Sequence, residues 1–194
     1  EAINLWDPIS NLDQYLRNQK KDTDINSIGK DSQVDPTAKV TGPVIIGSNC
    51  EIKEGVLIRG GVIIGDNCVI GHGCEIKHSI MMSGTTIAHF NYIGDSVIGN
   101  RVNFAAGALT ANFKHGTKNE IVNIENGGKK TPTGLRKFGS LVGDEAKIGC
   151  NAVLDPGTII GKGTIVYPLA AIRGSIPANK IVKYRQSLEV VDQK

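Results

Sequence analysis

The chain has 194 residues, of which 40% are hydrophobic but only 5% aromatic; 24 are glycine, and the formal net charge is +3. This length suits one domain, or one domain with an appendage, and the small charge and scarce aromatic rings argue against a nucleic-acid-binding surface. No apolar stretch approaches the ~18 residues of a membrane span, and no basic-then-apolar leader opens the sequence. We therefore expect a soluble, cytoplasmic protein without a membrane or nucleic-acid partner.

Residues 1–27 precede the repetitive part of the chain and are expected to hold a hinge and a short helix. The helix is predicted over residues 11–17, which read NLDQYLR. Because a repetitive fold leaves its end units exposed, we expect this segment to cap the first unit. Residues 174–194 are expected to form an arm that caps the other end.

From residue 28 onward, aliphatic residues recur at every sixth position. One run covers ten positions from Ile28 to Met82 and another covers six positions from Val142 to Ile172, while two spacings of five occur between Met82 and Thr110. A period of six matches neither an α-helix nor the simple alternation of a strand, but it suits short strands joined by regular corners. The sequence therefore predicts an all-β fold, a parallel β-solenoid over residues 28–173 with its aliphatic anchors stacked inside.

Three of the four cysteines fit the same register. Cys50, Cys68 and Cys74 each lie four residues beyond an anchor, where small or β-branched residues recur. The cysteines contain no CxxC pair, and the chain is too long for a disulfide scaffold. We therefore expect these three to be reduced residues of the core rather than metal ligands.

Residues 113–140 interrupt the repeat with a basic segment. They contain six Lys or Arg residues and two Glu, a local charge of 6 − 2 = +4. Asn126-Gly127-Gly128 predicts the turn of a projecting hairpin. Because a loop of this length in a regular fold is usually functional, we expect it to contact an anionic ligand. The alternative is a solvated basic loop.

Two cations are predicted to lie above one another on neighbouring coils. If one coil is three hexads, Arg59 and Lys77 stack, because each follows its anchor by one residue. Stacked cations repel unless an anion lies between them or they splay into water. A phosphate group fits both side chains, since Arg offers a fork of donors and Lys a point charge.

The same arithmetic places His89 beneath Ala106. Each follows its anchor by two residues, and His72 falls one coil below His89. A neutral imidazole, with a pKa near ~6.5, can take a proton from an attacking amine. A backbone N–H beside it can stabilise an oxyanion, so the pair suits acyl transfer.

These positions belong to a longer run that resembles one protein family. Residues 58–61 read IRGG, 75–77 read EIK, 88–99 read AHFNYIGDSVIG, 102–107 read VNFAAG and 110–113 read TANF. The run is similar to the acetyltransferase domain of the bifunctional enzymes that acetylate glucosamine-1-phosphate and then uridylylate it. These are hexapeptide-repeat acyltransferases. The resemblance implies a left-handed parallel β-helix and a homotrimer with its sites between subunits.

The resemblance also implies residue roles. His89 matches the general base, Arg59 and Lys77 match the residues that hold the sugar phosphate, and Ala106 matches the residue whose N–H contacts the acetyl carbonyl. Further substrate-binding positions are Tyr92, Asn103, Asn112 and Lys118. Acetyl-CoA is the implied co-substrate, with no metal, and its contacts fall at Ala106, Cys150, Pro168 and Arg185. Cys150 and Pro168 depart from the family's residue types, and Phe113 replaces a family tyrosine.

Two segments of the loop resemble a particular branch of the family. Residues 112–116 (NFKHG) and 133–139 (TGLRKFG) look like the form found in archaeal-type sugar-1-phosphate nucleotidyltransferases. The nucleotidyltransferase half is absent from these 194 residues, since no glycine-rich nucleotide loop occurs in them. We expect either an excised C-terminal domain or a naturally short relative.

The expected function is transfer of acetyl from acetyl-CoA to the amine of glucosamine-1-phosphate or galactosamine-1-phosphate, feeding the synthesis of UDP-N-acetyl sugars. An alternative from another class is a non-catalytic β-helix that trimerises and regulates an attached nucleotidyltransferase. A third possibility, a zinc carbonic anhydrase on this fold, needs three convergent histidines. The spacing of His72, His78 and His89 does not match that pattern.

Overall fold

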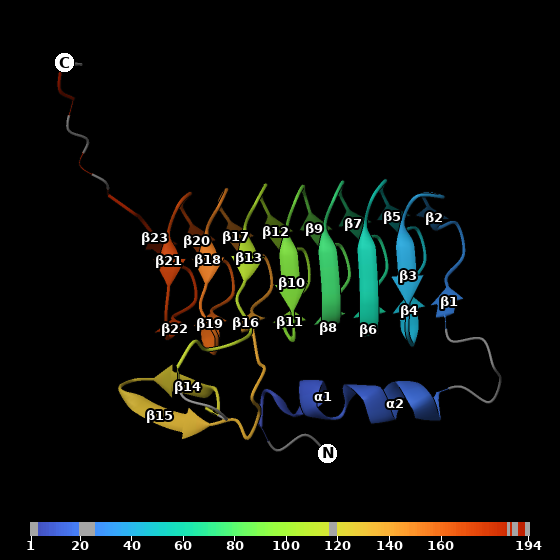
Figure 1. The fold of residues 1–194 in the computed structure, drawn as a ribbon, viewed down its shortest axis with the longest axis horizontal. Helices are drawn as coiled ribbons and strands as arrows, with labels where there is room; N and C mark the ends of the chain where they lie inside the picture. The colour runs from blue at the N-terminus through green and yellow to red at the C-terminus, as the bar shows by residue number, and fades with distance from the viewer. Residues whose placement is uncertain (1–3, 20–25, 117–119, 186, 188–189, 193–194) are drawn as a thin grey trace.

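The computed structural model describes residues 4–19, 26–116, 120–185, 187 and 190–192. Its coils follow one another along a single axis, with short helices beside them (Figure 1). Neighbouring coils pair in parallel throughout, in a 13-stranded and an 8-stranded sheet. The predicted all-β, left-handed parallel β-helix is confirmed.

The strands form three faces of a prism. The first face contains β3 (Lys39–Thr41), β10 (Tyr92–Gly94), β13 (Leu109–Thr110), β18 (Val153–Leu154) and β21 (Ala171–Ile172). The second contains β1 (Asn26–Ile28), β4 (Val44–Ile46), β11 (Val97–Ile98), β16 (Ser140–Val142), β19 (Thr158–Ile160) and β22 (Ser175–Ile176). Two long strands, β6 (Leu57–Ile64) and β8 (Glu75–Met81), run across the corner between these faces.

The third face is the 8-stranded sheet. It contains β2 (Gln33–Val34), β5 (Glu51–Ile52), β7 (Val69–Ile70), β9 (Thr86–Ile87), β12 (Asn103–Phe104), β17 (Lys147–Ile148), β20 (Ile165–Val166) and β23 (Ile181–Val182). Each strand is short because a corner follows within a few residues. Every coil therefore presents three corners to solvent, and the candidate functional residues gather at two of these series of corners.

The interior is a ladder of stacked aliphatic side chains, as the six-residue period predicts. Ile58, Ile76 and Ile93 lie in register on successive coils and are fully buried. Cys50, Cys68 and Cys74 are buried in the same core, whereas Cys150 is exposed, and all four are free thiols. Burial of this stack stabilises the fold by about 25 cal/mol for each Å² of apolar surface removed from water.

The sequence prediction was wrong about one anchor, because one coil is a residue shorter than its neighbour. Ile64 pairs with Met81, which is 1% exposed, while the predicted anchor Met82 is 43% exposed. The register shifts in a bulge between Arg59 and Val62, where Gly60 and Gly61 both have positive φ. Glycine readily adopts positive φ, so β6 can accommodate its extra residue opposite β8, the strand from which one residue is missing.

The solenoid also continues beyond its predicted end at residue 173. β22 pairs with β19 and β23 pairs with β20, so another partial coil extends to Val182. Ile160 is opposite Ile176, and this 16-residue step breaks the period of six that was counted in the sequence. The segment predicted as a terminal arm is thus partly a stacked coil.

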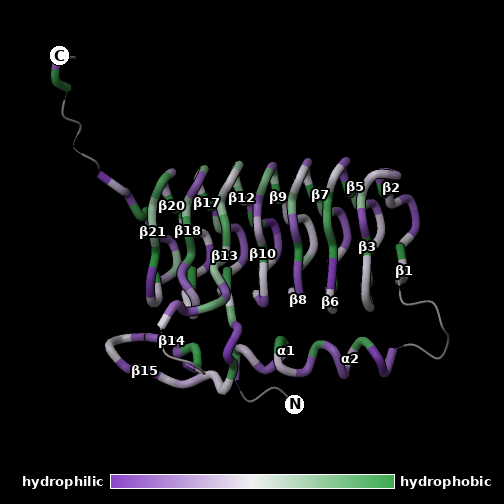
Figure 2. Tube along the Cα trace, viewed as in Figure 1, coloured by the Kyte–Doolittle hydropathy of each residue, from purple (hydrophilic) through white to green (hydrophobic). Residues whose placement is uncertain are grey.

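The amino-terminal helices lie along the side of the coils instead of over the first coil (Figure 1). Both α1 (Asp7–Ser10) and α2 (Leu12–Asn18) are amphipathic, with alternating hydrophobic and hydrophilic stretches (Figure 2). Ile9 packs in a second hydrophobic cluster with Ile80 and Val97, whose side chains face outward from the second face. Ile28 of the first coil is 51% exposed, so these helices do not cap that coil and the prediction of a cap was wrong.

The basic insertion forms the predicted hairpin. β14 (Asn123–Asn126) and β15 (Lys129–Pro132) are antiparallel, and the turn between them has positive φ at Gly127 and Gly128. The hairpin packs back on the solenoid, since Val122 and Ile124 are buried in the second cluster. Ser175 Oγ also donates a hydrogen bond of 2.5 Å to the Glu125 carbonyl.

Among the described residues, no helix is both long and apolar enough to cross a membrane.

Candidate functional site

Asp95 lies at the centre of a polar cluster on the corner between the first and second faces. Its Oδ2 accepts a 2.9 Å hydrogen bond from Lys77 Nζ, and its Oδ1 accepts a 3.0 Å bond from His78 Nδ1. Asn112 Nδ2 donates to Oδ2 as well as to the Tyr92 hydroxyl, 3.0 Å away. We call Lys77, His78, Tyr92, Asp95 and Asn112 the Asp95 cluster.

The backbone brings this cluster together from three successive coils. The Asp95 N–H donates to the Lys77 carbonyl over 2.9 Å, and the Gly139 N–H donates to the Asp95 carbonyl over 2.8 Å. The insertion leaves the solenoid after Asn112 and returns beside it, where the Phe138 N–H donates to the Asn112 carbonyl. Three predicted substrate residues, Lys77, Tyr92 and Asn112, therefore lie at the base of the inserted loop.

The sequence analysis missed Asp95 and assigned no role to His78. The signal was present, since Asp95 lies 18 residues after Lys77 and 17 before Asn112, which is one coil in each direction. The corner between anchors Ile93 and Ile98 is one residue shorter than the regular hexad. That irregularity obscured how the polar side chains align.

The predicted stack of Arg59 on Lys77 is confirmed, but carboxylates of the protein accompany both cations. Arg59 and Lys77 are register partners in β6 and β8. Arg59 Nε and Nη2 lie 2.8 and 2.6 Å from Glu75 Oε1, and Lys77 is paired with Asp95. The repulsion that suggested an anionic guest is thus already relieved within the chain.

Burial and charge shift two pKa values in the cluster. Burial raises the pKa of Asp95, but hydrogen bonds from His78, Lys77 and Asn112 and the charge of Lys77 outweigh this effect, leaving the pKa below its ordinary value. Burial is also the largest cause that raises the pKa of Tyr92, and the negative charge of Asp95 adds to it. Asp95 is therefore a stable anion whose field reaches the Tyr92 hydroxyl.

A second series of corners, between the third and first faces, carries His89. The Gly107 N–H donates to the His89 carbonyl over 2.8 Å, which places Ala106 on His89 as predicted. The same bonding pattern continues from Asn151 to Ala106 and from Leu169 to Cys150. This corner column is made of His72, His89, Ala106, Cys150 and Pro168.

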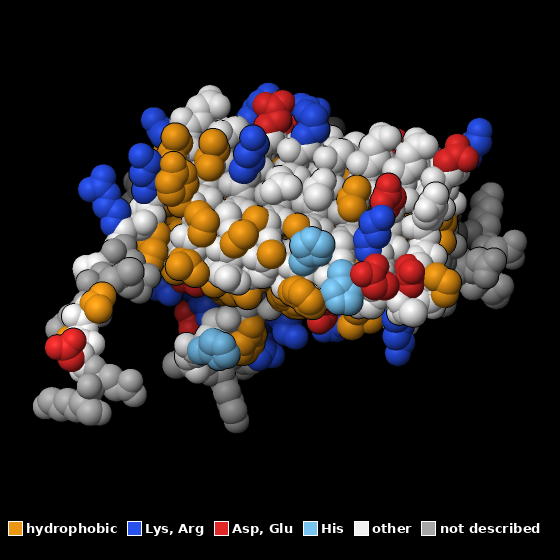
Figure 3. Space-filling view, turned by 90° about the horizontal axis from the view of Figure 1, so that it is seen from above, with side chains coloured by type: hydrophobic (Ala, Val, Ile, Leu, Met, Phe, Trp, Pro, Cys, Tyr) orange, Lys and Arg blue, Asp and Glu red, His pale blue; other side chains and the backbone are white. Residues whose placement is uncertain are grey.

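The corner column is open to solvent. His89, Cys150 and Pro168 are exposed, and the Ala106 N–H has no hydrogen-bond acceptor within the described part of the chain. Figure 3 shows histidine side chains on this side of the molecule beside hydrophobic side chains that gather over the carboxyl-terminal coils. The arrangement offers a base, an unused backbone donor and an apolar edge.

One chain does not bring all the predicted site residues together. His89 and the Asp95 cluster occupy opposite corners of the first face, and no hydrogen bond or ion pair links them within the described ranges. Asn103 is exposed on the third face, and Arg185 is exposed beyond β23. Lys118 lies outside the described residues. His72 and His89 share a corner while His78 lies at another, so these histidines do not converge in one chain.

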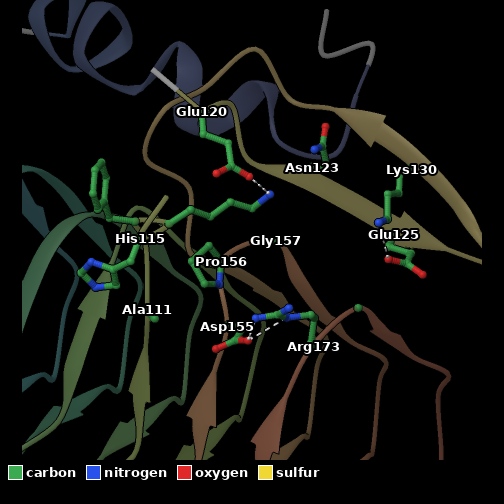
Figure 4. Close-up of a pocket in the computed structure, with 13 residues that line it drawn as sticks. Ala111, His115, Glu120, Asn123, Glu125, Lys130, Asp155, Pro156, Gly157 and Arg173 are labelled. Carbon is green, nitrogen blue, oxygen red and sulfur yellow. Dashed lines mark hydrogen bonds and ion pairs between the residues drawn. The ribbon is translucent and has the colours of Figure 1, made fainter. Parts of the chain in front are cut away.

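A cavity of about 410 Å³ lies between the insertion and the last coils, and nothing in the six-residue repeat indicated it (Figure 4). Its walls carry three cations, each near a carboxylate, at distances of 3.1, 3.9 and 2.9 Å. The pairs are Lys114 with Glu120, Lys130 with Glu125, and Arg173 with Asp155. The charges of these six described lining residues balance, so together they do not make the cavity wall basic.

Comparison with known proteins agrees with the fold. Residues 40–113 match the family model described as the GMPPB C-terminal domain. Among solved structures, a mutant of AntD, an N-acyltransferase from Bacillus cereus in complex with dTDP and coenzyme A, superposes with a TM-score of 0.51 and 18% identity. That alignment covers 85% of this chain and 82% of the AntD chain. The fold class is therefore that of the left-handed parallel β-helix proteins.

In sequence, the chain is similar to part of two bifunctional proteins. It is 37% identical over 105 residues to the bifunctional sugar-1-phosphate nucleotidylyltransferase/acetyltransferase of Sulfurisphaera tokodaii, covering 54% of this chain and 26% of that protein. It is 28% identical over 174 residues to the bifunctional protein GlmU of Exiguobacterium sibiricum, covering 90% of this chain and 30% of that protein. The chain thus spans less than a third of the length of either relative.

Proposed function

We propose that the protein is an acetyl-CoA-dependent N-acetyltransferase acting on an amino-sugar 1-phosphate. The observation that carries the proposal is the stack of the exposed His89 beneath Ala106, whose N–H is unused among the described residues. The similarity to the Sulfurisphaera tokodaii enzyme, named as an acetyltransferase, supports the same reaction. Glucosamine-1-phosphate and galactosamine-1-phosphate are both substrates of the proposed class.

The proposed reaction joins the amine nitrogen to the acetyl carbon and breaks the thioester C–S bond. His89 accepts the proton that the amine loses and returns it to the departing coenzyme A thiolate. The Ala106 N–H donates to the carbonyl oxygen as it gains negative charge. General-base action of this kind contributes ~10²–10⁴-fold to the rate.

Arg59 and Lys77 are the proposed phosphate contacts. The Arg59 side chain is 45% exposed, so its pair with Glu75 can be exchanged for a phosphate without uncovering a buried charge. Lys77 is more buried and stays attached to Asp95. Asn112, Tyr92, Asn103 and Lys118 are proposed to contact the sugar, and Cys150, Pro168 and Arg185 the coenzyme.

We further propose that the active form is a homotrimer. His89 and the Asp95 cluster lie at opposite corners of one face, and in the proposed trimer a neighbouring subunit would complete a site that uses both. Light scattering coupled to size-exclusion chromatography measures the mass directly. A monomer at assay concentration that retains full activity would contradict this arrangement.

The function is tested by replacing His89 and comparing it with the neighbouring histidine of its column. His89→Ala is expected to lose at least 10²-fold in the rate of thiol release from acetyl-CoA with glucosamine-1-phosphate. His72→Ala lies one coil lower and is expected to retain activity. Unchanged circular dichroism in both variants controls for folding, and full activity of His89→Ala would refute the proposed mechanism.

One observation favours the alternative of a non-catalytic, trimerising and regulatory domain. The carboxylates of Glu75 and Asp95 already accompany Arg59 and Lys77, so these cations have partners without a ligand. Calorimetry with acetyl-CoA separates the two functions. Binding supports the transferase, and no binding at millimolar ligand supports the regulatory domain.

A further inference from the structure

We propose that Asp95 is the positioning residue of the sugar-phosphate site, holding the Lys77 ammonium and the Asn112 amide in the single arrangement that a substrate meets. This inference rests on the function proposed above, which uses Lys77 and Asn112 but assigns nothing to Asp95. The Asp95 side chain is 6% exposed. Its role follows from how its two oxygens are occupied.

The Asp95 carboxylate has no acceptor position left for a ligand. An ionised carboxylate offers about four lone-pair sites. Oδ1 accepts from Lys77 Nζ at 3.2 Å and from His78 Nδ1 at 3.0 Å, while Oδ2 accepts from Lys77 Nζ at 2.9 Å and from Asn112 Nδ2. Asp95 therefore acts through its neighbours and does not contact the substrate.

Asp95 decides which end of the Asn112 amide is presented. A carboxylate can receive only the N–H end of an amide, so the contact fixes the orientation of Asn112. The same Nδ2 donates to the Tyr92 hydroxyl, 3.0 Å away. Asn112 Oδ1 then accepts nothing from the described residues, and Tyr92, having accepted a bond, keeps its own O–H to donate. The corner thus offers one acceptor and one donor to a ligand that carries hydroxyl groups.

Asp95 also sets how strongly Lys77 attracts an anion. The ammonium has three N–H groups, and the two Asp95 oxygens take up to two of them. At least one N–H remains for a phosphate oxygen, with its direction set by Asp95. The Lys77 side chain is 18% exposed, so it reaches a ligand from a fixed position and not by rotating freely in solvent.

The kinetic test compares Asp95→Asn with Asp144→Asn. Asn tolerates the positive φ of 48° at position 95, so the backbone is kept while the charge and one pair of acceptor sites are lost. Asp144 is a matched control, because it accepts hydrogen bonds from Asn100 N and Nδ2 at another corner. We expect Asp95→Asn to lose about 10- to 100-fold in kcat/KM for glucosamine-1-phosphate, with KM for acetyl-CoA unchanged. Asp144→Asn is expected to match the wild type.

A wild-type kcat/KM in a folded Asp95→Asn protein would overturn the proposal and leave Asp95 a purely structural role. Since removing the carboxylate leaves a buried ammonium unpaired, this variant can fail to fold. Asp95→Glu keeps the charge beside Lys77 but displaces the oxygens by one methylene. The same loss is expected of it, and wild-type kinetics in Asp95→Glu would equally overturn the proposal.

A second readout does not depend on acetyl transfer. The ionisation of Tyr92 can be followed by NMR of ¹³C-labelled tyrosine and assigned with Tyr92→Phe. Because the Asp95 charge contributes to the raised pKa of Tyr92, Asp95→Asn is expected to lower that pKa and Asp144→Asn to leave it unchanged. If the wild type acetylates no amino-sugar phosphate, the proposed function fails, and this titration then still tests separately whether the Asp95 charge acts on Tyr92. An unchanged Tyr92 pKa in Asp95→Asn would count against it.

Discussion

Lys77 and Asp95 form an ion pair of 2.9 Å at a corner of the solenoid, with the lysine side chain 18% and the aspartate side chain 6% exposed. Neutralising one member of a buried pair leaves the other charge without a partner, which is strongly destabilising. The same two residues belong to the proposed substrate site. The protonation of Asp95 therefore links the stability of the fold to the state of this site.

We expect acid to weaken the fold partly through Asp95. Its pKa in the folded protein lies below the ordinary value, since the hydrogen bonds and the Lys77 charge outweigh burial. The contribution of ionised Asp95 to the free energy of unfolding is fully present above its unfolded-state pKa of about 3.9. It is lost as the pH falls through the lower pKa that Asp95 has in the folded protein. Urea unfolding measured between about pH 7 and about pH 2 gives the decline of the free energy of unfolding with falling pH. Asp95→Asn should show a shallower decline, and identical slopes would contradict the assignment.

Arg59→Ala is expected to raise KM for glucosamine-1-phosphate by about 10- to 100-fold, because one charge-assisted phosphate contact is lost. KM for acetyl-CoA should not change. Arg173→Ala is the matched comparison, since Arg173 lies in the same column of the first face and pairs with Asp155 at 2.9 Å. If Arg173→Ala raises KM and Arg59→Ala does not, the phosphate binds in the cavity beneath the insertion.

One thiol of the four is expected to react with a water-soluble disulfide reagent in the folded protein. Cys150 is exposed, whereas Cys50, Cys68 and Cys74 are buried. Burial raises the pKa of the Cys68 thiol to about 11, so little reactive thiolate forms near neutral pH. Spectrophotometric counting should give one reactive thiol before unfolding and four afterwards. The folded Cys150→Ser variant should show no reactive thiol. Reaction of any of its three remaining thiols before unfolding would argue against the stacked core.

Gly71→Ala is expected to destabilise the protein by about 3 kcal/mol or more, as severe overpacking does. A Cβ atom at Gly71 would lie 1.4 Å from the Ala88 carbonyl oxygen on the next coil. Gly116→Ala is a fair comparison, because among the described residues its Cβ would meet the end of the Glu120 side chain, which can move aside. Thermal unfolding of both variants measures the difference. Equal midpoints would show that the coils are spaced more loosely at this corner.

Part of the architecture beyond the repeat was readable in the sequence. The residues before the anchors of the second face are apolar, as at Ile80, Val97 and Leu141. Outward apolar side chains on a solenoid require a cover, and α1 with the insertion supplies it. Periodicity alone could not say which segment would do so, because it describes only the coils themselves.

The six-residue repeat was enough to predict the solenoid, its stacked cysteines and the columns that place Arg59 on Lys77 and Ala106 on His89. These follow from a repeat in which each coil must bury the same aliphatic positions, so register propagates from coil to coil. The one-residue deletion in β8, where His78 alone lies opposite Gly60 and Gly61, displaced a single predicted anchor without disturbing that order.

Which polar groups meet at a corner depends on how the coils and the insertion pack together. Lys77, Asp95 and Asn112 come from three coils, and the two ends of the insertion join at the same place. Their contacts depend on corner geometry and side-chain direction, which a six-residue period does not encode. At this corner the side chains of Lys77 and Asn112 are partly buried and both hydrogen-bond to Asp95.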